Sequence, residues 1–496
     1  MINGDVSTIS KQADISPDIK LQPHQQAVVK KVTDQLNKKD KARMLLYHSL
    51  GSGKTLSGLA AAEGSGLPYT AVVPASLRTN LKKEQEKFID PATAAPSHVM
   101  SHTALGKGDP VINPQSLIVD EAHRFRNMQS AQSQNLLEAA RKARQVVLLS
   151  GTPIVNSPED FAVPYSILTN KDITPKEFGE RYVEKPDTKV PWYKLLLNVK
   201  PEGPGLKNVN ELKGALEGKV DYFAPLKPKA DINREDVVVE MNRDQTDIYN
   251  QLFGKLPTLL KWKLQLNYPL SDAESKKLFS FLTGPRQVGL SPLPFMKEDA
   301  NPLKAFEKSP KLNEAFKRIN ELLKNDPKGK ALVFSNFIEA GLEPYLAALN
   351  KAGVPAAAFT GSLSDKERKK LVDDYNADKL RVALLGPSGT EGLSFKGTKL
   401  VQLLDPHWNT TRGSQSEGRA LRFDSHEHLP PEERKVKIER YIARTAPGRL
   451  KSLLRNVGMK AEPELATDDY LIAAAQRKQE LNEKFLNLLR EIGGKR

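Results

Sequence analysis

The sequence predicts an α/β fold with two parallel sheets that a helical middle region separates. From Leu21 to about Leu168, apolar runs typical of buried strands alternate with helical patterns, and a short polar or Gly/Pro-bearing turn ends each run. A second alternating region begins near Ser309. The residues between these regions are rich in Lys, Pro and Gly up to about Asp231, and helical patterns broken by prolines follow. Because alternating strands and helices are typical of a parallel sheet covered by helices, each region predicts one such sheet.

The predicted strands are short apolar runs bounded by turn residues. In the first region they lie at residues 44–47, 70–73, 116–119 and 145–149. In the second region they lie at residues 330–335, 381–385, 399–404 and 436–443. The tail of the chain predicts an amphipathic helix, because its apolar residues return on one stripe. That stripe consists of Leu481, Phe485, Leu488 and Ile492.

Length and composition limit the class of protein. At 496 residues the chain is too long for one core, and the usual size of domains suggests about three units. No stretch approaches the ~18 uninterrupted apolar residues that a membrane span needs. The polar N-terminal segment lacks the apolar core of a signal peptide. We therefore expect a soluble, intracellular protein of the cytoplasm or nucleoid with no membrane partner.

The chain has no cysteine, which excludes disulfides, thiolate chemistry and cysteine-based zinc sites. Its eight histidines occur singly or as the pair His426 and His428, and none stands in a carboxylate cluster with the spacing of metal ligands. The sequence therefore predicts no structural metal.

The formal net charge of +15 has two interpretations. It can reflect a generally basic, soluble surface, or a groove that follows the phosphates of a nucleic acid. Residues 435–460 favour the groove, because eight Lys or Arg residues stand there against a single acid, Glu439. The charge supports a nucleic-acid partner without establishing one.

A candidate nucleotide-binding loop lies between the first predicted strand and a helix start. It consists of Gly51, Ser52, Gly53, Lys54 and Thr55. Glycines let backbone N–H groups turn inward and bind phosphate oxygens at the positive end of the helix. Lys54 is expected to reach the β- and γ-phosphates, and the Thr55 hydroxyl to hold Mg²⁺. The usual pattern begins with Gly or Ala where this chain has His48.

Two further polar segments follow predicted strands. In LIVDEAHRFRN, Asp120 suits the Mg²⁺ shell and Glu121 suits a base that orients the attacking water. Acids at the end of a buried strand are costly unless they are paired or bound to metal. We expect His123 to couple this segment to the next one, LLSGTPIVNSPEDF, and not to bind metal. There, the hydroxyls of Ser150 and Thr152 can hydrogen-bond the carboxylate pair and relay the state of the nucleotide.

In this order, GSGKT, DEAH and SGTP resemble the first lobe of superfamily-two helicases, with its P-loop and DEAH box. The segment AVVPASLRTN resembles the family motif that contacts the nucleic-acid backbone, which implies that role for Ser76 and Asn80. LQPHQQAVV resembles the upstream segment whose glutamine reads adenine. The resemblance therefore implies that Gln25 recognises adenine, and that ATP rather than GTP is the nucleotide.

Motifs of the second region indicate which family within superfamily two the chain resembles. ALVFSNF, LLGPSGTEGLSF, VQLLDPHWN and QSEGRALRF resemble motifs of the Swi/Snf-type ATPases, and the tail resembles the bracing helix of that family. HSLGSGKT is also similar to helicase-like NTPases of large DNA viruses and phages, which suggests a viral or phage-encoded origin. The resemblance spans roughly residues 20–490 and implies two RecA-like lobes. The implied divisions are a flexible N-terminal arm (1–20), a first RecA-like ATP-binding lobe (21–168), an insertion and helical protrusion (169–307), a second RecA-like helicase C-terminal lobe (308–455) and a C-terminal helical brace (456–496).

The second lobe is expected to complete the chemistry. Phosphoryl transfer needs positive charge on the developing γ-phosphate, and QSEGRALR places Arg419 and Arg422 three residues apart on one helix face. We expect both to reach the phosphates when the lobes close, with Gln415 helping to couple closure. The resemblance implies backbone-phosphate contacts for a second set of residues, which comprises Ser388, Gly389 and Thr390.

These features together predict an ATP- and Mg²⁺-dependent motor that translocates on double-stranded DNA. Contacts to phosphates position a protein without reading sequence, which suits a translocating motor. Two alternatives remain open. One is a helicase that separates strands of DNA or RNA, and the other is an ATP-gated binding subunit of a viral transcription or packaging assembly.

Overall fold

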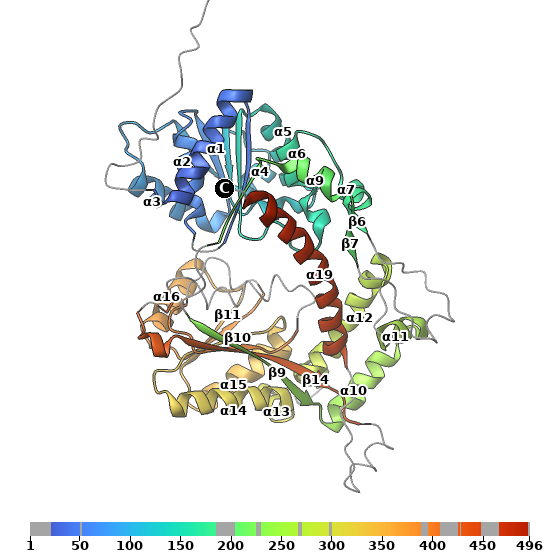
Figure 1. Cartoon of the computed structure of the whole chain (residues 1–496). Helices are drawn as coiled ribbons and strands as arrows, with labels where there is room; N and C mark the ends of the chain where they lie inside the picture. The colour runs from blue at the N-terminus through green and yellow to red at the C-terminus, as the bar shows by residue number, and fades with distance from the viewer. Residues whose placement is uncertain are drawn as a thin grey trace, which may run out of the picture. The chain divides into compact units, whose positions relative to one another are not determined.

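The described residues of the computed structural model fall into two compact units (Figure 1). Unit 1 comprises residues 1–185, 204–226 and 478–496, and unit 2 comprises residues 186–203 and 227–477. Each unit contains a six-stranded sheet whose paired strands all run parallel, so the predicted α/β fold with two parallel sheets is confirmed. The structure describes residues 21–49, 52–184, 204–224, 230–265, 270–296, 300–387, 395–406, 425–426, 428–447 and 466–494.

The sheet of unit 1 has the strand order β3-β2-β4-β5-β1-β8. Its strands are β1 (Ala42–His48), β2 (Tyr69–Val73), β3 (Ser97–Ser101), β4 (Ser116–Val119), β5 (Gln145–Ser150) and β8 (Val220–Phe223). All four strands predicted for the first region are present. Two strands, β3 and β8, were not predicted, and β8 comes from the segment assigned to the insertion.

Helices cover both faces of this sheet (Figure 1). Successive residues of β1 point to opposite faces, so Met44 and Leu46 enter one core while Leu45 and Tyr47 enter the other. The first core is closed by α1 (Pro23–Lys39), α2 (Lys54–Glu63) and α3 (Arg78–Phe88). The second core is closed by α4 (His102–Gly106), α5 (Ala131–Lys142), α6 (Ala162–Thr169), α7 (Pro175–Tyr182), α9 (Val209–Leu216) and the end of α19 (Thr467–Gly493).

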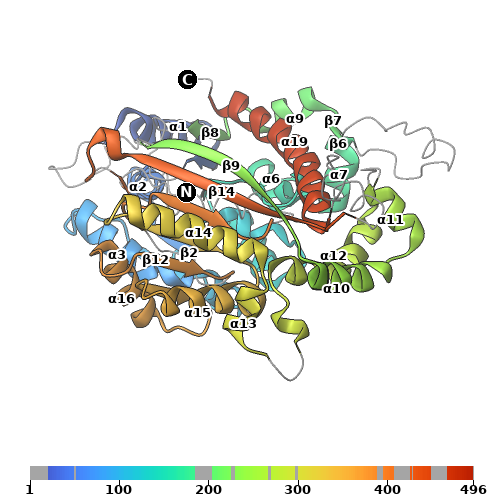
Figure 2. The same cartoon turned by 90° about the horizontal axis from the view of Figure 1, so that it is seen from below.

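The sheet of unit 2 has the order β11-β12-β10-β13-β14-β9. Its strands are β9 (Asp231–Glu240), β10 (Ala331–Phe334), β11 (Ala356–Phe359), β12 (Val382–Leu385), β13 (Leu400–Leu403) and β14 (Lys435–Arg444). One face packs against α13 (Pro302–Glu307), α14 (Pro310–Asn325) and α15 (Glu343–Lys351), and the other against α16 (Asp365–Asn376). Figure 2 shows the long edge strand β9 beside β14, with which it pairs over its whole length, and α14 beside this pair.

A helical subregion completes unit 2. It contains α10 (Arg243–Gly254), α11 (Thr258–Gln265), α12 (Asp272–Leu290) and the start of α19, with small apolar cores among them. A buried ion pair fixes the start of α19, because Lys311 Nζ lies 2.7 Å from Asp468 Oδ2. The same carboxylate oxygen accepts a hydrogen bond from the backbone N–H of Ala443.

The predicted insertion at 169–307 divides between the two units. Its residues 204–226 belong to unit 1 through β8, and its residues from 227 onward belong to unit 2 through β9 and the helices. The predicted tail helix is also shared, since α19 belongs to unit 2 up to Arg477 and to unit 1 from Lys478. Across the described residues, no helix is long and apolar enough to cross a bilayer.

Candidate nucleotide-binding site

Three polar segments meet at one edge of the sheet of unit 1. In a parallel sheet the carboxyl ends of the strands lie on the same side, which is where such sheets bind ligands. The nucleotide loop follows β1, Asp120 and Glu121 follow β4, and Ser150 ends β5. Since β5 pairs with both β1 and β4, these three segments are near neighbours.

The loop enters α2 in a conformation that suits phosphate binding. Gly53 caps the helix with φ +72°, a left-handed backbone that favours glycine. A side chain there would also collide with the amide of Gln25, because a Cβ would lie 2.8 Å from Nε2. Lys54 is the first residue of α2 and Thr55 the second, so both stand at the positive end of the helix dipole. Gly51 lies outside the described residues.

Two side chains of α1 hold the carbonyl groups of this loop. His24 Nε2 lies 2.9 Å from the carbonyl oxygen of Ser52, and Gln25 Nε2 lies 3.5 Å from that of Gly53. The Gln25 Oε1 atom accepts a hydrogen bond from the N–H of Gln22, which caps α1. Gln25 therefore lies next to the loop, while its contact with adenine stays a prediction. His24 was missed, although it stands beside Gln25 in the same motif.

The two carboxylates after β4 have different surroundings. Asp120 is buried, with 6% of its surface exposed, and its Oδ1 accepts a hydrogen bond from the N–H of Glu121. Glu121 has φ 50° and ψ 47°, a left-handed conformation that is uncommon for a residue other than glycine and is often found at functional sites. This backbone directs the Glu121 carboxylate toward Lys54, whose Nζ lies 3.5 Å from Oε1.

A chain of polar contacts continues from Glu121. Its Oε2 lies 3.3 Å from His123 Nδ1, which lies 3.1 Å from Ser150 Oγ. The Ser150 hydroxyl in turn accepts a hydrogen bond from the backbone N–H of Thr152. The Ser150 hydroxyl therefore contacts His123 rather than the carboxylate pair as predicted, and Thr152 takes part through its backbone N–H.

Burial and charge move the pKa values of the pair in opposite directions. Burial raises the pKa of Asp120 to about 6, although the charge of Lys54 opposes this shift. Burial also disfavours the ionised form of Glu121, but the charge of Lys54 and its hydrogen bond with Glu121 oppose this effect, and the pKa of Glu121 lies below the ordinary value. Burial lowers the pKa of His123 to about 4, so this imidazole is neutral at pH 7. A pair of carboxyl groups separated in this way is typical of catalytic sites.

A second histidine supports the carboxylate pair and was not predicted. His102, at the start of α4, lies with Nε2 2.9 Å from the carbonyl oxygen of Asp120 and packs its ring against Phe125. Burial lowers its pKa to about 4. Its position indicates that His102 fixes the backbone of the carboxylate pair.

The predicted nucleic-acid contacts are only partly described. Ser76 lies in a short 3₁₀ turn after β2, and the side chain of Asn80 is exposed on α3. The other predicted nucleic-acid contacts, Ser388, Gly389 and Thr390, lie outside the described parts of the chain. The same holds for Gln415, Arg419 and Arg422, for which coupling and catalysis were predicted. In the described ranges, no three His, Asp or Glu side chains gather closely enough to form a metal site by themselves.

Two family models match this chain. The model of the SNF2-related domain matches residues 100–183, and that of the helicase conserved C-terminal domain matches residues 314–424. A putative ATP-dependent RNA helicase of Acanthamoeba polyphaga mimivirus is 26% identical over 90% of this chain and 93% of its own length. The two matched domains support the resemblance of this chain to Swi/Snf-type, helicase-like ATPases of superfamily two. The same matches support a nucleic-acid-dependent ATP hydrolase.

A second viral protein and one solved structure are also similar to this chain. A termination factor NPH-I homologue of African swine fever virus is 23% identical over 90% of this chain and 75% of its own length. The solved SWI2/SNF2 ATPase core of Sulfolobus solfataricus, in complex with double-stranded DNA, covers 98% of this chain at 15% identity and a TM-score of 0.36. The strand order of its own two sheets shows the fold of this chain.

The structure changes the interpretation of the basic segment of this ATPase. Three of the basic residues at 435–460 pair with carboxylates inside unit 2: Lys437 with Glu235 and Glu439, Arg440 with Asp236, and Arg444 with Asp469. Their charges are partly neutralised by the fold. For these three residues the predicted phosphate-binding role is therefore replaced by a role in joining β14 to its neighbours.

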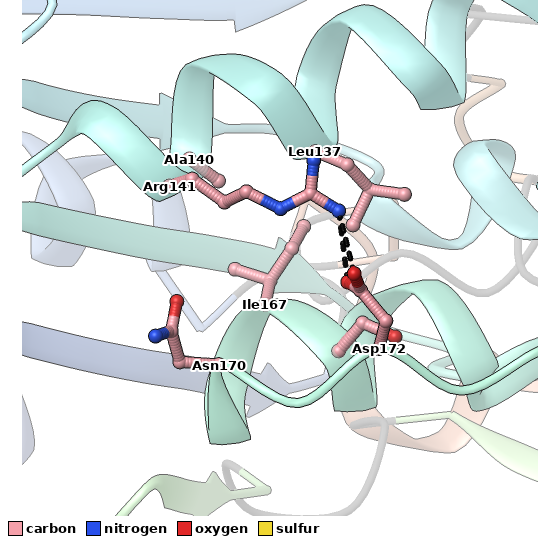
Figure 3. Close-up of a pocket in the computed structure, with 7 residues that line it drawn as sticks. Leu137, Ala140, Arg141, Ile167, Asn170 and Asp172 are labelled. Carbon is pink, nitrogen blue, oxygen red and sulfur yellow. Dashed lines mark hydrogen bonds and ion pairs between the residues drawn. The ribbon is translucent and has the colours of Figure 1, made fainter.

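A separate pocket of about 210 Å³ lies on unit 1 of the ATPase (Figure 3). It lies between α5 and the end of α6 and is lined by Leu137, Ile167 and neighbouring residues. Arg141 and Asp172 form a hydrogen-bonded ion pair across it, with side chains 53% and 69% exposed. An exposed pair of this kind contributes little to stability. None of the predicted site residues lines this pocket.

Proposed function

We propose that this ATPase is a motor that hydrolyses Mg²⁺-bound ATP and translocates along double-stranded DNA without separating its strands. The observation that carries the proposal is the chain of contacts from Lys54 through Glu121 and His123 to Ser150. These contacts join the nucleotide loop to the end of β5. A change at the nucleotide can therefore reach the segment after β5, as a motor requires.

The residues at the sheet edge fit ATP and its metal ion. The N-terminus of α2 offers free N–H groups for phosphate oxygens, and Lys54 adds a mobile positive charge. Asp120 is a buried carboxyl group whose raised pKa a neighbouring cation would lower again. Thr55 and Asp120 would hold Mg²⁺ together with phosphate oxygens, and the ion would neutralise charge on the phosphates.

Within this site, Glu121 is the residue best suited to orient the attacking water. Its pKa lies below the ordinary value, so its carboxylate is ionised at pH 7 and can accept a hydrogen bond from water. His123, neutral at this pH, contacts both Glu121 and Ser150. We propose that His123 couples the position of Glu121 to the segment after β5.

The second lobe supplies the rest of the proposed mechanism. Arg419 and Arg422 belong to the range matched by the helicase conserved C-terminal domain. We propose that they stabilise the charge that develops on the transferring phosphoryl group, with Gln415 coupling lobe closure to this step. We also propose backbone-phosphate contacts by residues of both lobes, namely Ser76, Asn80, Ser388, Gly389 and Thr390.

The choice of duplex DNA rests on the net charge of +15 and on the Swi/Snf-type motifs of both lobes. Two relatives favour other partners by their names, since one is a putative RNA helicase and another a termination factor homologue. The test compares duplex DNA, single-stranded DNA and RNA as stimulators of ATP turnover, together with a strand-displacement assay. We expect duplex DNA to stimulate most, with no displacement. Stimulation by RNA alone would refute the duplex-DNA proposal, and efficient displacement would identify a helicase.

The nucleotide site itself has a simpler test. Lys54→Ala should abolish turnover while leaving fold and DNA binding nearly intact, because no other described group of the loop can bring a mobile positive charge to the phosphates. Turnover like that of the wild type would remove this loop from the mechanism.

A further inference from the structure

A buried polar cluster lies behind the nucleotide loop and includes His48, which stands where the usual loop pattern has Gly or Ala. His48 ends β1, and its Nε2 atom lies 2.8 Å from Oδ1 of Asp221 on β8. Both side chains are completely buried. The other oxygen of Asp221 lies 2.6 Å from Nζ of Lys31 on α1. The cluster therefore joins three segments that are far apart in the sequence and that surround the start of the loop.

The same strand also holds the loop through its backbone and through an aromatic contact. The N–H of Ser49, the first residue after β1, donates a hydrogen bond to the carbonyl oxygen of Phe223 at 3.0 Å. The Phe223 ring stacks on His24 with a centroid distance of 3.7 Å and an interplanar angle of 8°. His24 is the residue that contacts the Ser52 carbonyl. β8 thus contacts Ser49, just before the loop, directly, and it contacts Ser52 through His24.

These contacts determine which way the peptide groups of the loop face. A loop binds phosphate when its N–H groups point inward, and this requires its carbonyl groups to be satisfied on the outer side. The Ser52 carbonyl has His24 as its partner, and the Gly53 carbonyl has Gln25. A firmly placed β8 therefore keeps His24 in contact with the Ser52 carbonyl and holds the residue before the loop in place.

The position of β8 depends on the cluster because Asp221, a residue of this strand, is a buried carboxylate that needs its partners. Burial opposes ionisation of Asp221, but its hydrogen bonds with His48 and Lys31 hold its pKa below the ordinary value. The cluster therefore contains a buried carboxylate at pH 7. Removing one partner of such a pair leaves the other buried without compensation, which is strongly unfavourable. The Nδ1 atom of His48 already has no partner, so this imidazole depends on its contact with Asp221.

We propose that Asp221 is a positioning residue for ATP hydrolysis, which acts through His48 to hold the nucleotide loop in its phosphate-binding conformation. The inference rests on the nucleotide site proposed above. It assigns a role in the ATPase site to the segment 204–226, which the sequence alone placed in an insertion. Asp221 does not touch the nucleotide, so its loss should weaken ATP binding more than it slows the chemical step.

The test is a double-mutant cycle on the full chain. Asp221→Ala should raise KM for ATP about tenfold and change kcat less, since the hydrogen bonds of Asp221 with His48 and Lys31 are both lost. His48→Ala should act in the same direction. If the pair acts as a unit, the double variant should have a KM close to that of Asp221→Ala and not the product of the two effects. Asp221→Asn keeps an oxygen that accepts from His48, so its KM should stay within about twofold of the wild type.

Two controls separate the possible failures. Asp236→Ala removes an ion-paired aspartate from another edge strand, β9 of unit 2, and should leave KM unchanged. Lys54→Ala, assayed in parallel, tests the site itself, because full turnover in that variant would refute the nucleotide site rather than the role of Asp221. If Asp221→Ala does not fold, Asp221→Asn and His48→Ala still test the proposal. A KM like that of the wild type in His48→Ala or Asp221→Ala, or single effects that multiply in the double variant, would overturn it.

Discussion

Replacing Asp120 by asparagine should stabilise the nucleotide-free protein at pH 7 while abolishing ATP turnover. The Asp120 side chain is buried, and burial raises its pKa from the ordinary value of 3.8 to about 6. A carboxyl group whose pKa rises on folding keeps its proton more tightly in the folded state. Its ionisation therefore costs stability progressively as the pH rises from about 4 to about 6. A difference of about two pKa units, at 1.36 kcal/mol each, gives a cost of about 3 kcal/mol at pH 7.

The pH dependence distinguishes this cause from a general packing effect. Below about pH 3 the carboxyl group is largely neutral in both states, so the variant should gain little there. At pH 5 the gain should be about 1.5 kcal/mol, and at pH 7 it should reach about 3 kcal/mol. Because the chain has two compact units, its unfolding need not follow a single transition. Hydrogen exchange of the strand β4, measured without nucleotide or Mg²⁺, reports on unit 1 directly.

The control for this measurement is Asp172→Asn. Its side chain is 69% exposed, so the change should alter stability little at any pH. The reasoning is refuted if Asp120→Asn is less stable than the wild type at pH 7, or if its gain is the same at pH 5 and pH 7. Retained turnover in Asp120→Asn would separately contradict the assignment of this residue to the Mg²⁺ shell.

Three further predictions concern other parts of the molecule. Arg419→Ala should lower nucleic-acid-stimulated turnover by roughly a thousandfold while ATP affinity falls much less. If only Arg422→Ala abolishes turnover, Arg422 and not Arg419 stabilises the charge on the transferring phosphoryl group. Duplex DNA affinity should fall on the order of a thousandfold between about 50 and 200 mM salt if about six phosphates are neutralised, and a flat response in a binding titration would contradict this. In unit 2, Lys311→Ala should lower the free energy of unfolding by about 3–5 kcal/mol, because it leaves Asp468 buried without its cation; a loss below about 1 kcal/mol in denaturant titration would show that the pair is dispensable.

The strands that could be predicted are those buried on both faces. Such strands are typically continuous apolar runs, and β1 and β10 show this plainly, because every residue of both is buried. The edge strands were not predicted. The strand β9 carries the charged run DINREDVVVE, and its charges are satisfied only by partners such as Arg318 and Lys437 that the fold brings to it. The strand β8 has a charged residue, Asp221, inside it, so it is not a continuous apolar run.

The same distinction applies to the site. Lys54, Glu121, His123 and Ser150 were predictable because each stands in a motif that follows a buried strand. Asp221 was not, because its function depends on pairing between β1 and β8 and not on its neighbours in the chain. The basic segment at 435–460 shows the opposite case, since a run of positive charge says nothing of the carboxylates that the fold places beside it.

The central claim is that ATP hydrolysis at this site drives movement along duplex DNA without opening it. The most direct measurement is displacement of a third strand from a DNA triplex by the full chain, with Glu121→Gln as the hydrolysis-deficient control. We predict ATP-dependent release of the third strand by the wild type, no release by Glu121→Gln, and an intact underlying duplex. Failure to release the third strand under conditions where duplex DNA stimulates ATP turnover, or release accompanied by separation of the duplex strands, would contradict the claim.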